Sequence, residues 1–189
     1  MASRRATKGP SLSPLGAVVR GVIAGAVGTV ALDAANYAQY RAGGGTEEPL
    51  QWEFAEGLDS WEAAPAPAQV GKRLYEGLFQ KELPPGSVRL VTNVMHWGYG
   101  TMWGAVYGVV AASTRSRRLR GPLFGTLVWL SGYVVLPMAG LYEPIWKYDG
   151  KTLAKDWSGH LAYGTAAAAA FRVLGGRRSR GRSGGPSGD

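Results

Sequence analysis

Residues 90–114, LVTNVMHWGYGTMWGAVYGVVAAST, contain no Lys, Arg, Asp or Glu. Two more uncharged runs cover residues 121–142 and 157–171, and residues 15–40 are interrupted only by Arg20 and Asp33. A helix needs about 20 mainly apolar residues to cross the hydrocarbon core of a bilayer. Core helices of a soluble protein are the alternative, but two of the runs match the bilayer length. The sequence therefore predicts an all-α membrane protein with four transmembrane helices.

Composition narrows the chemistry of the chain. It has 189 residues, of which 46% are hydrophobic and 18% are charged, and it has no cysteine. The missing cysteines exclude disulfides, thiolate metal sites and cysteine nucleophiles. The net charge of +8 could indicate nucleic-acid binding. However, the basic residues gather in short runs beside the uncharged spans, so we expect the lipid bilayer, and no nucleic acid, as the partner.

The arginine runs predict an orientation. They lie at positions 4 and 5, at 115, 117, 118 and 120, and at 177, 178, 180 and 182, whereas residues 41–87 hold eight acids and four bases. Four crossings place the arginine runs on one side, which the positive-inside rule makes the cytoplasm. We expect a protein of the bacterial inner membrane with both termini cytoplasmic. The predicted parts are a basic tail (1–14), a transmembrane domain (15–175) with spans at about 15–40, 88–112, 120–142 and 156–174 and an outer insertion at 41–87, and a basic disordered tail (176–189).

Two phrases occur twice in the chain. His-x-x-Tyr-Gly-Thr begins at His96 and at His160, and Arg-Gly-x-x-x-Gly begins at Arg20 and at Arg120. Each time, a span that runs outward is followed by a span that runs inward. This order predicts two duplicated helical hairpins in parallel orientation. The two histidines should then occupy equivalent places.

Small residues recur four apart on these spans, and residues at this spacing share one helical face. In lipid, such residues let helix backbones approach closely. We expect a tight bundle, and a homo-oligomer or another membrane protein is a further candidate partner. The predicted packing glycines are Gly21, Gly25, Gly100, Gly104, Gly108 and Gly164.

The outer insertion predicts two short amphipathic helices. Leu50, Phe54, Leu58 and Trp61 repeat at helical spacing, and a second such pattern covers residues 70–78. A stretch rich in Pro and Ala separates the two. We expect both helices to cap the bundle on its outer surface, with partner binding as the alternative.

Polar residues from all four spans are expected at one level near the outer boundary. Ionisable groups inside a membrane are costly and usually face the bundle interior or water. A hydrogen-bonded network that joins the helices is the favoured interpretation, with Asp33 as the partner of His96 and with Glu143 or Asp156 as the partner of His160. A proton relay is the alternative, because histidine titrates near neutral pH. A metal site is disfavoured, since no close-spaced ligand pair is present. The predicted layer comprises Asp33, Asn36, Asn93, His96, Tyr99, Glu143, Asp156, His160 and Tyr163.

Three stretches carry a family resemblance: GVIAGAVGTVALD, PAPAQVGKRLYEGLF and NVMHWGYGTMWGAVYG. Together they resemble the small bacterial inner-membrane proteins of the YagU type over about residues 15–172. The resemblance implies an integral membrane protein of undefined activity with a connection to acid stress. It carries over no catalytic residues.

Three classes of function remain open. The first is a non-enzymatic bundle with a structural, accessory or stress-related role. The second is a small transporter or channel subunit that uses the polar layer. The third, a membrane enzyme, ranks last because the chain has no nucleophile elbow, zinc motif or nucleotide loop. We predict no catalytic residues, no cofactor and no metal.

Overall fold

The computed structural model describes residues 12–113 and 120–180. Within these residues the fold is all-helical, with six α-helices, two 3-10 turns and no strand. The helices are α1 (Pro14–Ala42), α2 (Pro49–Glu53), α3 (Ala66–Phe79), α4 (Val88–Ser113), α5 (Arg120–Met138) and α6 (Gly150–Arg180), and the turns are η1 (Pro85–Ser87) and η2 (Ile145–Lys147). Residues 1–11, 114–119 and 181–189, which hold most of the predicted basic runs, lie outside the described residues.

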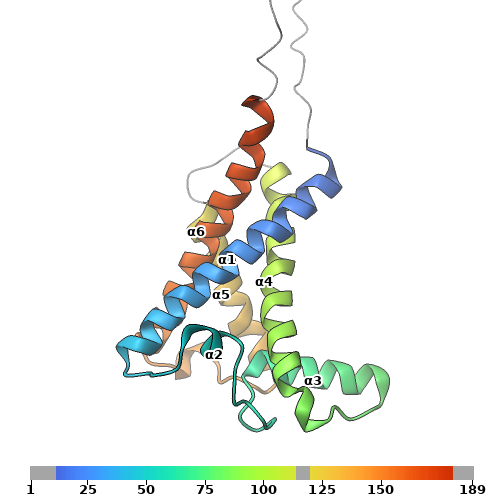
Figure 1. The fold of residues 1–189 in the computed structure, drawn as a ribbon, viewed down its shortest axis with the longest axis vertical. Coiled ribbons are helices and arrows are strands. Elements are labelled where there is room, and N and C mark those ends of the chain that lie inside the picture. The colour runs from blue at the N-terminus through green and yellow to red at the C-terminus, as the bar shows by residue number, and fades with distance from the viewer. Residues whose placement is uncertain (1–11, 114–119, 181–189) are drawn as a thin grey trace, which may run out of the picture.

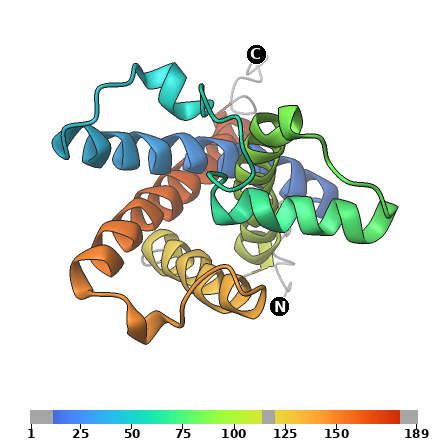
Figure 2. The same ribbon diagram turned by 90° about the horizontal axis from the view of Figure 1, so that it is seen from below.

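Four long helices form the body of the molecule (Figure 1). α1 packs against both α4 and α6, and α6 packs against α5. The start of α1 and the end of α6 lie at one end of this bundle, and α2, α3 and the connections around them lie at the other (Figure 1). Seen from that second end, α3 extends crosswise to α4 (Figure 2). We call this second end the α3 end.

Two of the four long helices have the composition of a membrane span. Among the described residues, α1 and the Gly121–Met138 part of α5 are long and apolar enough to cross a bilayer. α4 and α6 are as long, with 26 and 31 residues, but they contain many Trp, Tyr, His, Lys and Gly residues. The composition of these two helices thus favours a membrane protein.

The helix boundaries differ from the predicted spans at α5 and α6. α5 ends at Met138 rather than at residue 142, since Pro137 lies in its last turn and Gly140 adopts a left-handed conformation with φ of 65°. α6 begins six residues early because Asp149 accepts hydrogen bonds from the backbone N–H groups of Lys151 and Thr152, at 2.9 and 3.0 Å. Its backbone stays helical to Arg180, past the predicted start of the C-terminal tail at residue 176.

The outer insertion folds into one longer helix and one short one. α3 has 14 residues, as its apolar spacing predicts, but α2 ends at Glu53, well before Trp61. Ala55 and Gly57 have φ angles of 49° and 85°, which no continuing helix can adopt. Val88 of α4 packs with Ala64 and Ala68, so α3 is fixed to the bundle through small residues.

Glycines set the two closest helix contacts. A Cβ atom built on Gly25 of α1 would lie 2.6 Å from the carbonyl oxygen of Gly100 and 2.8 Å from the Cα atom of Gly104, both on α4. A Cβ atom on Gly121 of α5 would lie 2.9 Å from the carbonyl oxygen of Gly164 on α6. No side chain fits at these points, so the backbones themselves are in contact.

α4 and α5 meet through aromatic rings instead. The ring of Phe124 lies 4.9 Å from that of Tyr107 and 6.1 Å from that of Trp103. Tyr107 and Phe124 belong to the buried core of the bundle together with Val128, Tyr163 and Ala168. Nearer the α3 end this aromatic packing stops, and a cavity opens between the helices.

Candidate functional site

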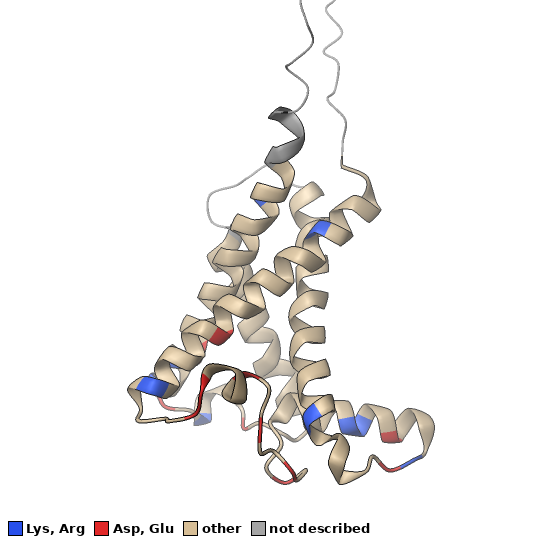
Figure 3. Ribbon diagram, in the orientation of Figure 1, with Lys and Arg blue, Asp and Glu red and all other residues tan. Residues whose placement is uncertain are grey.

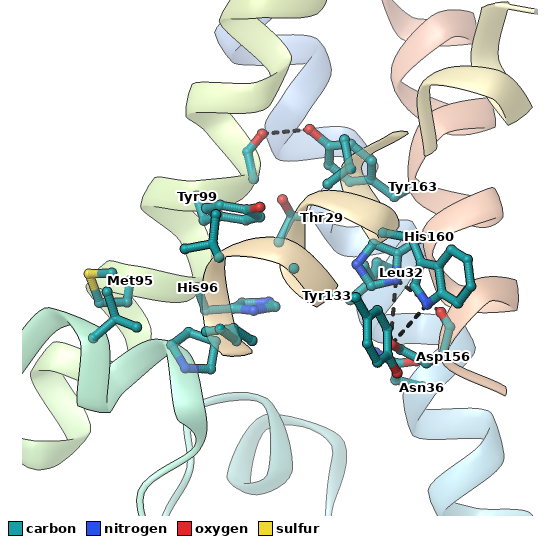
Figure 4. Close-up of a pocket in the computed structure, with 18 of the residues that line it drawn as sticks. Thr29, Leu32, Asn36, Met95, His96, Tyr99, Tyr133, Asp156, His160 and Tyr163 are labelled. Atoms are coloured by element: carbon teal, nitrogen blue, oxygen red, sulfur yellow. Dashed lines mark hydrogen bonds and ion pairs between the residues drawn. The ribbon is translucent and has the colours of Figure 1, made fainter. Parts of the chain in front are cut away.

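The cavity between α4 and α5 has a volume of about 270 Å³. α1, α3, α4, α5 and α6 all contribute to its wall, which is mainly apolar. Figure 4 shows side chains from opposite walls that point toward one another across the cavity. Its polar lining comprises Thr29, Asn36, His96, Asp156 and His160 and the four tyrosines Tyr99, Tyr133, Tyr142 and Tyr163. Both histidines of the chain therefore share one chamber.

His96 is held by a carboxylate from another helix. Its Nε2 atom lies 2.9 and 3.0 Å from the two carboxylate oxygens of Asp33 on α1. Asp33 is only 7% exposed. The predicted pairing of Asp33 with His96 is thus present, because consecutive antiparallel helices bring the two positions to one level.

His160 is held within its own helix. Its Nδ1–H group donates a hydrogen bond to the backbone carbonyl of Asp156, at 2.9 Å. The Asp156 carboxylate lies 3.5 Å from the same nitrogen and accepts a bond of 3.0 Å from the indole N–H of Trp129 on α5. Since Nδ1 is the donor, neutral His160 has its acceptor lone pair on Nε2. Of the two predicted partners, Asp156 is present and Glu143 is not.

The two tyrosines of the repeated phrase each join two helices. The Tyr163 hydroxyl donates to the carbonyl of Gly100 across the bundle, at 2.6 Å, and its side chain is almost fully buried. The Tyr99 hydroxyl lies 2.6 Å from the Ser131 hydroxyl of α5. Because Ser131 donates its own proton to the Val128 carbonyl, Tyr99 is the donor in that bond.

Two residues of the predicted layer, Glu143 and Asn93, lie outside the cavity, and a third, Asn36, lines it. Glu143 is exposed in the connection after α5, where its backbone N–H donates to the Tyr148 hydroxyl. α5 ends before that residue, so the predicted contact with His160 is absent. Asn93 faces the outer insertion and donates to the Phe54 carbonyl at 3.3 Å. Asn36 lines the cavity and packs against Gly159 of α6.

The two hairpins pack in different registers of the repeated phrase. Gly21 contacts Gly104 and Gly108, and Gly121 contacts Gly164 and Ala168. Gly104 and Gly164 therefore make the same contact in the two hairpins, and they are 60 residues apart in the sequence. The His-x-x-Tyr-Gly-Thr motif repeats after 64 residues instead. When the two hairpins are aligned by their glycine contacts, His160 is displaced by four residues, about one helical turn, from the position of His96. The prediction that they occupy equivalent places is wrong.

Some residues around the cavity were not predicted from the sequence. Trp129 and Tyr133 of α5 line it. The indole of Trp129 bonds to Asp156, and Tyr133 lies beside Asp156 in Figure 4. Glu53 comes from α2, in the outer insertion, and its ligand atom lies near those of Asp33 and His96. Burial, followed by the neighbouring Asp33 carboxylate, raises the pKa of Glu53. The spacing of apolar residues placed Trp129 and Tyr133 on a span but gave no sign of their direction, and nothing in the sequence indicated that α2 folds back onto α1.

Comparison with known proteins gives no further constraint. No family model matches the chain, and no curated protein and no solved structure is similar to it. The resemblance to YagU-type proteins rests on the three quoted stretches alone. The site therefore has to be interpreted from its own geometry.

Proposed function

We propose that the protein is an integral membrane protein of four spans that binds a small molecule in the cavity at its outer end and has no enzymatic activity. In this proposal α1, α4, α5 and α6 cross the inner membrane of a bacterial cell, and both termini are cytoplasmic. The observation that carries the binding role is a cavity of about 270 Å³ that both histidines line. Mainly apolar cavities with a few convergent polar groups are typical of small-molecule sites.

The outward surface of α4 supports its place in the bilayer. It exposes six large apolar side chains by 42–66%: Leu90, Val94, Met102, Val106, Val109 and Val110. Water disfavours so continuous an apolar face, whereas lipid does not. Among its polar side chains, His96 and Tyr99 line the cavity and Asn93 bonds to the outer insertion, so its composition is compatible with a span.

The charge distribution supports the orientation. In Figure 3 the charged residues of the described chain gather mainly at the α3 end, and the middle of the bundle has few. Along the chain, the arginine-rich runs lie before α1, between α4 and α5, and from the end of α6 onward. The start of α1 and the end of α6 lie opposite the α3 end, and positive charge next to them favours the cytoplasm on that side. Reporter fusions after residues 60, 117 and 189 should therefore read outside, inside and inside. A cytoplasmic signal at residue 60 would overturn the four-span proposal.

The chemistry of the cavity limits its ligand. The volume lies just below the range of about 300–1,000 Å³ that is usual for drug-sized ligands. His160 Nε2 can accept one hydrogen bond when the ring is neutral, and the hydroxyl of Thr29 already donates to the Gly25 carbonyl. We therefore expect a small, largely apolar molecule with one hydroxyl or amine donor.

Gly132 provides the test of this binding role. It lines the cavity, and a Cβ atom on it would meet no other atom within 4 Å. Gly132→Phe should fill the cavity without moving a helix. Gly98→Phe is the matched control, because Gly98 has equal space but is exposed on α4 and does not line the cavity.

Native mass spectrometry of protein released from its own membrane gives the readout. The wild type and Gly98→Phe should carry one small added mass, and Gly132→Phe should lack it. Retention of the mass by Gly132→Phe, or its absence from the wild type, would contradict the binding role.

A transporter or channel subunit is the second candidate, because two histidines and one carboxylate, from α4 and α6, line one chamber. Such a role requires that protons or a solute cross the membrane through the protein. Proteoliposomes with a pH-sensitive dye inside should then show proton entry that His160→Gln abolishes. Ligand binding without any flux would leave the binding proposal and reject this one.

A further inference from the structure

Beside the cavity, three side chains that can ligate metals converge from three helices. Asp33 comes from α1, Glu53 from α2 and His96 from α4, and one ligand atom of each lies within 4.8 Å of the other two. Ligands of a tetrahedral zinc ion, at about 2.1 Å from the metal, are about 3.4 Å from one another. The three atoms thus need to close by little more than about 1 Å to share an ion.

We propose that Asp33, Glu53 and His96 form a binding site for a divalent transition-metal cation of the Zn²⁺ or Mn²⁺ kind. The site goes beyond the proposed binding function and does not depend on what the cavity holds. Two carboxylates and a neutral imidazole carry a charge of −2, which one such ion neutralises. An imidazole ligand favours a transition metal over Mg²⁺ or Ca²⁺, which prefer oxygen ligands.

Burial of the carboxylates is the second observation that points to a cation. The Oε1 atom of Glu53 is buried and makes no hydrogen bond within the described residues. Asp33 is also buried, whereas the rest of the half-buried Glu53 side chain reaches the surface, so the Glu53 Oε1 atom and the Asp33 carboxylate lie close together away from water. A buried carboxylate oxygen without a donor is costly, and a shared cation would supply the missing partner.

A metal at this place would tie the outer insertion to the membrane helices. Glu53 is the last residue of α2, and among the three ligands it alone comes from outside the long helices. An ion between Glu53 and the pair Asp33–His96 would hold α2 against α1 and α4. His96 also lines the cavity, so the ion would lie next to that chamber.

The test is metal binding to the full-length chain in detergent, with any affinity tag removed and with metal stripped by a chelator. Zn²⁺ and Mn²⁺ are titrated separately by calorimetry, and Co²⁺ serves as a probe because its visible absorption reports nitrogen and oxygen ligands. One ion of Zn²⁺ or Mn²⁺ should bind per chain. Asp33→Asn, Glu53→Gln and His96→Gln should each weaken binding at least about tenfold, since even the loss of an outer-shell partner costs about 10- to 100-fold.

Two matched controls separate this site from surface binding. Glu56→Gln removes an exposed acid of the same segment, and His160→Gln removes the other histidine. Both should bind the ion as the wild type does. Glu53→Asp keeps the carboxylate on a shorter side chain and should retain part of the affinity, which shows that loss in Glu53→Gln reflects the ligand and not misfolding. Absence of binding by the wild type, or binding that survives all three ligand variants, would overturn the proposal.

Discussion

The two histidines begin the same six-residue phrase but have different surroundings. His96 pairs with a buried carboxylate of the preceding helix, whereas His160 bonds to a carbonyl of its own helix. The cause is the one-turn difference in packing register. In the first hairpin Asp33 faces His96, and in the second the corresponding residue, Tyr133, lies beside Asp156 (Figure 4). A repeated motif therefore places a residue on a helix, but the helix contact decides which partner it meets.

Small residues explain the difference in register. α4 offers Gly100, Gly104 and Gly108 on one face, so α1 crosses it around Gly104. On α6 the residue one turn after Gly164 is Ala168, whose Cβ atom would lie 3.1 Å from one built on Gly121. α5 therefore crosses α6 around Gly164, one turn nearer the α3 end.

The largest loss of stability is expected from a substitution at the point where α1 crosses α4. Gly104→Leu places a side chain against the backbone of Gly21 and Gly25, which cannot move aside. Overpacking of this kind costs about 3 kcal/mol or more. Thermal unfolding in detergent should show a large loss of stability. Gly98→Leu, on the same helix with open space, should change little, and equal effects of the two variants would refute the close contact.

The next largest losses of stability are expected when the carboxylate partner of each histidine is removed. Asp33→Ala leaves His96 without its buried partner and should cost about 2 kcal/mol, within the range for an unsatisfied buried group. Asp156→Ala should cost about 1 kcal/mol, because its carboxylate is more exposed and His160 keeps its carbonyl bond. Both are measured by unfolding in detergent with a chelator present. A larger loss for Asp156→Ala would reverse the comparison.

A smaller effect separates the two tyrosines of the phrase. Tyr163→Phe removes a buried hydrogen bond between α6 and α4 and should cost about 1 kcal/mol. Tyr99→Phe removes a bond to Ser131 that is less buried, and should cost about 0.5 kcal/mol. The same unfolding assay measures both. If Tyr99→Phe is the more damaging of the two, α4 and α5 are joined more firmly than the packing indicates.

The smallest expected change is the pH-dependent loss of the helix cap at the start of α6. Its cap, Asp149, has a lowered pKa because the Thr152 side chain and then the backbone N–H groups bond to its carboxylate. A lowered folded-state pKa means that the cap stabilises the helix above the unfolded pKa, about 4, and that this contribution is lost as the pH falls further. Hydrogen exchange of residues 151–153 should therefore accelerate, after correction for the intrinsic rate, only below about pH 4. Asp149→Asn caps without titrating and should remove that step.

The sequence predicted the all-helical class and the long helices, because uncharged runs are local signals. It also predicted the Asp33–His96 pair, which follows from two consecutive antiparallel helices. It placed Glu143 wrongly, since the end of α5 depends on Pro137 and Gly140 together. The proximity of Glu53 to Asp33 and His96 could not be predicted, because it depends on how α2 folds back onto α1. The difference in packing register could not be predicted either, because backbone contacts at glycines determine it. The repeated sequence motif does not specify those contacts.

The most direct test of the account is whether the cavity opens to the outer side. The natural chain has no cysteine, so Gly132→Cys gives a single thiol inside the cavity. A small, charged, membrane-impermeant methanethiosulfonate reagent added to intact cells should modify it, while Gly98→Cys, on the lipid-facing side of α4, should react far more slowly. Modification of Gly132→Cys only after the cells are permeabilised, or no faster than Gly98→Cys, would contradict an outward-facing binding cavity.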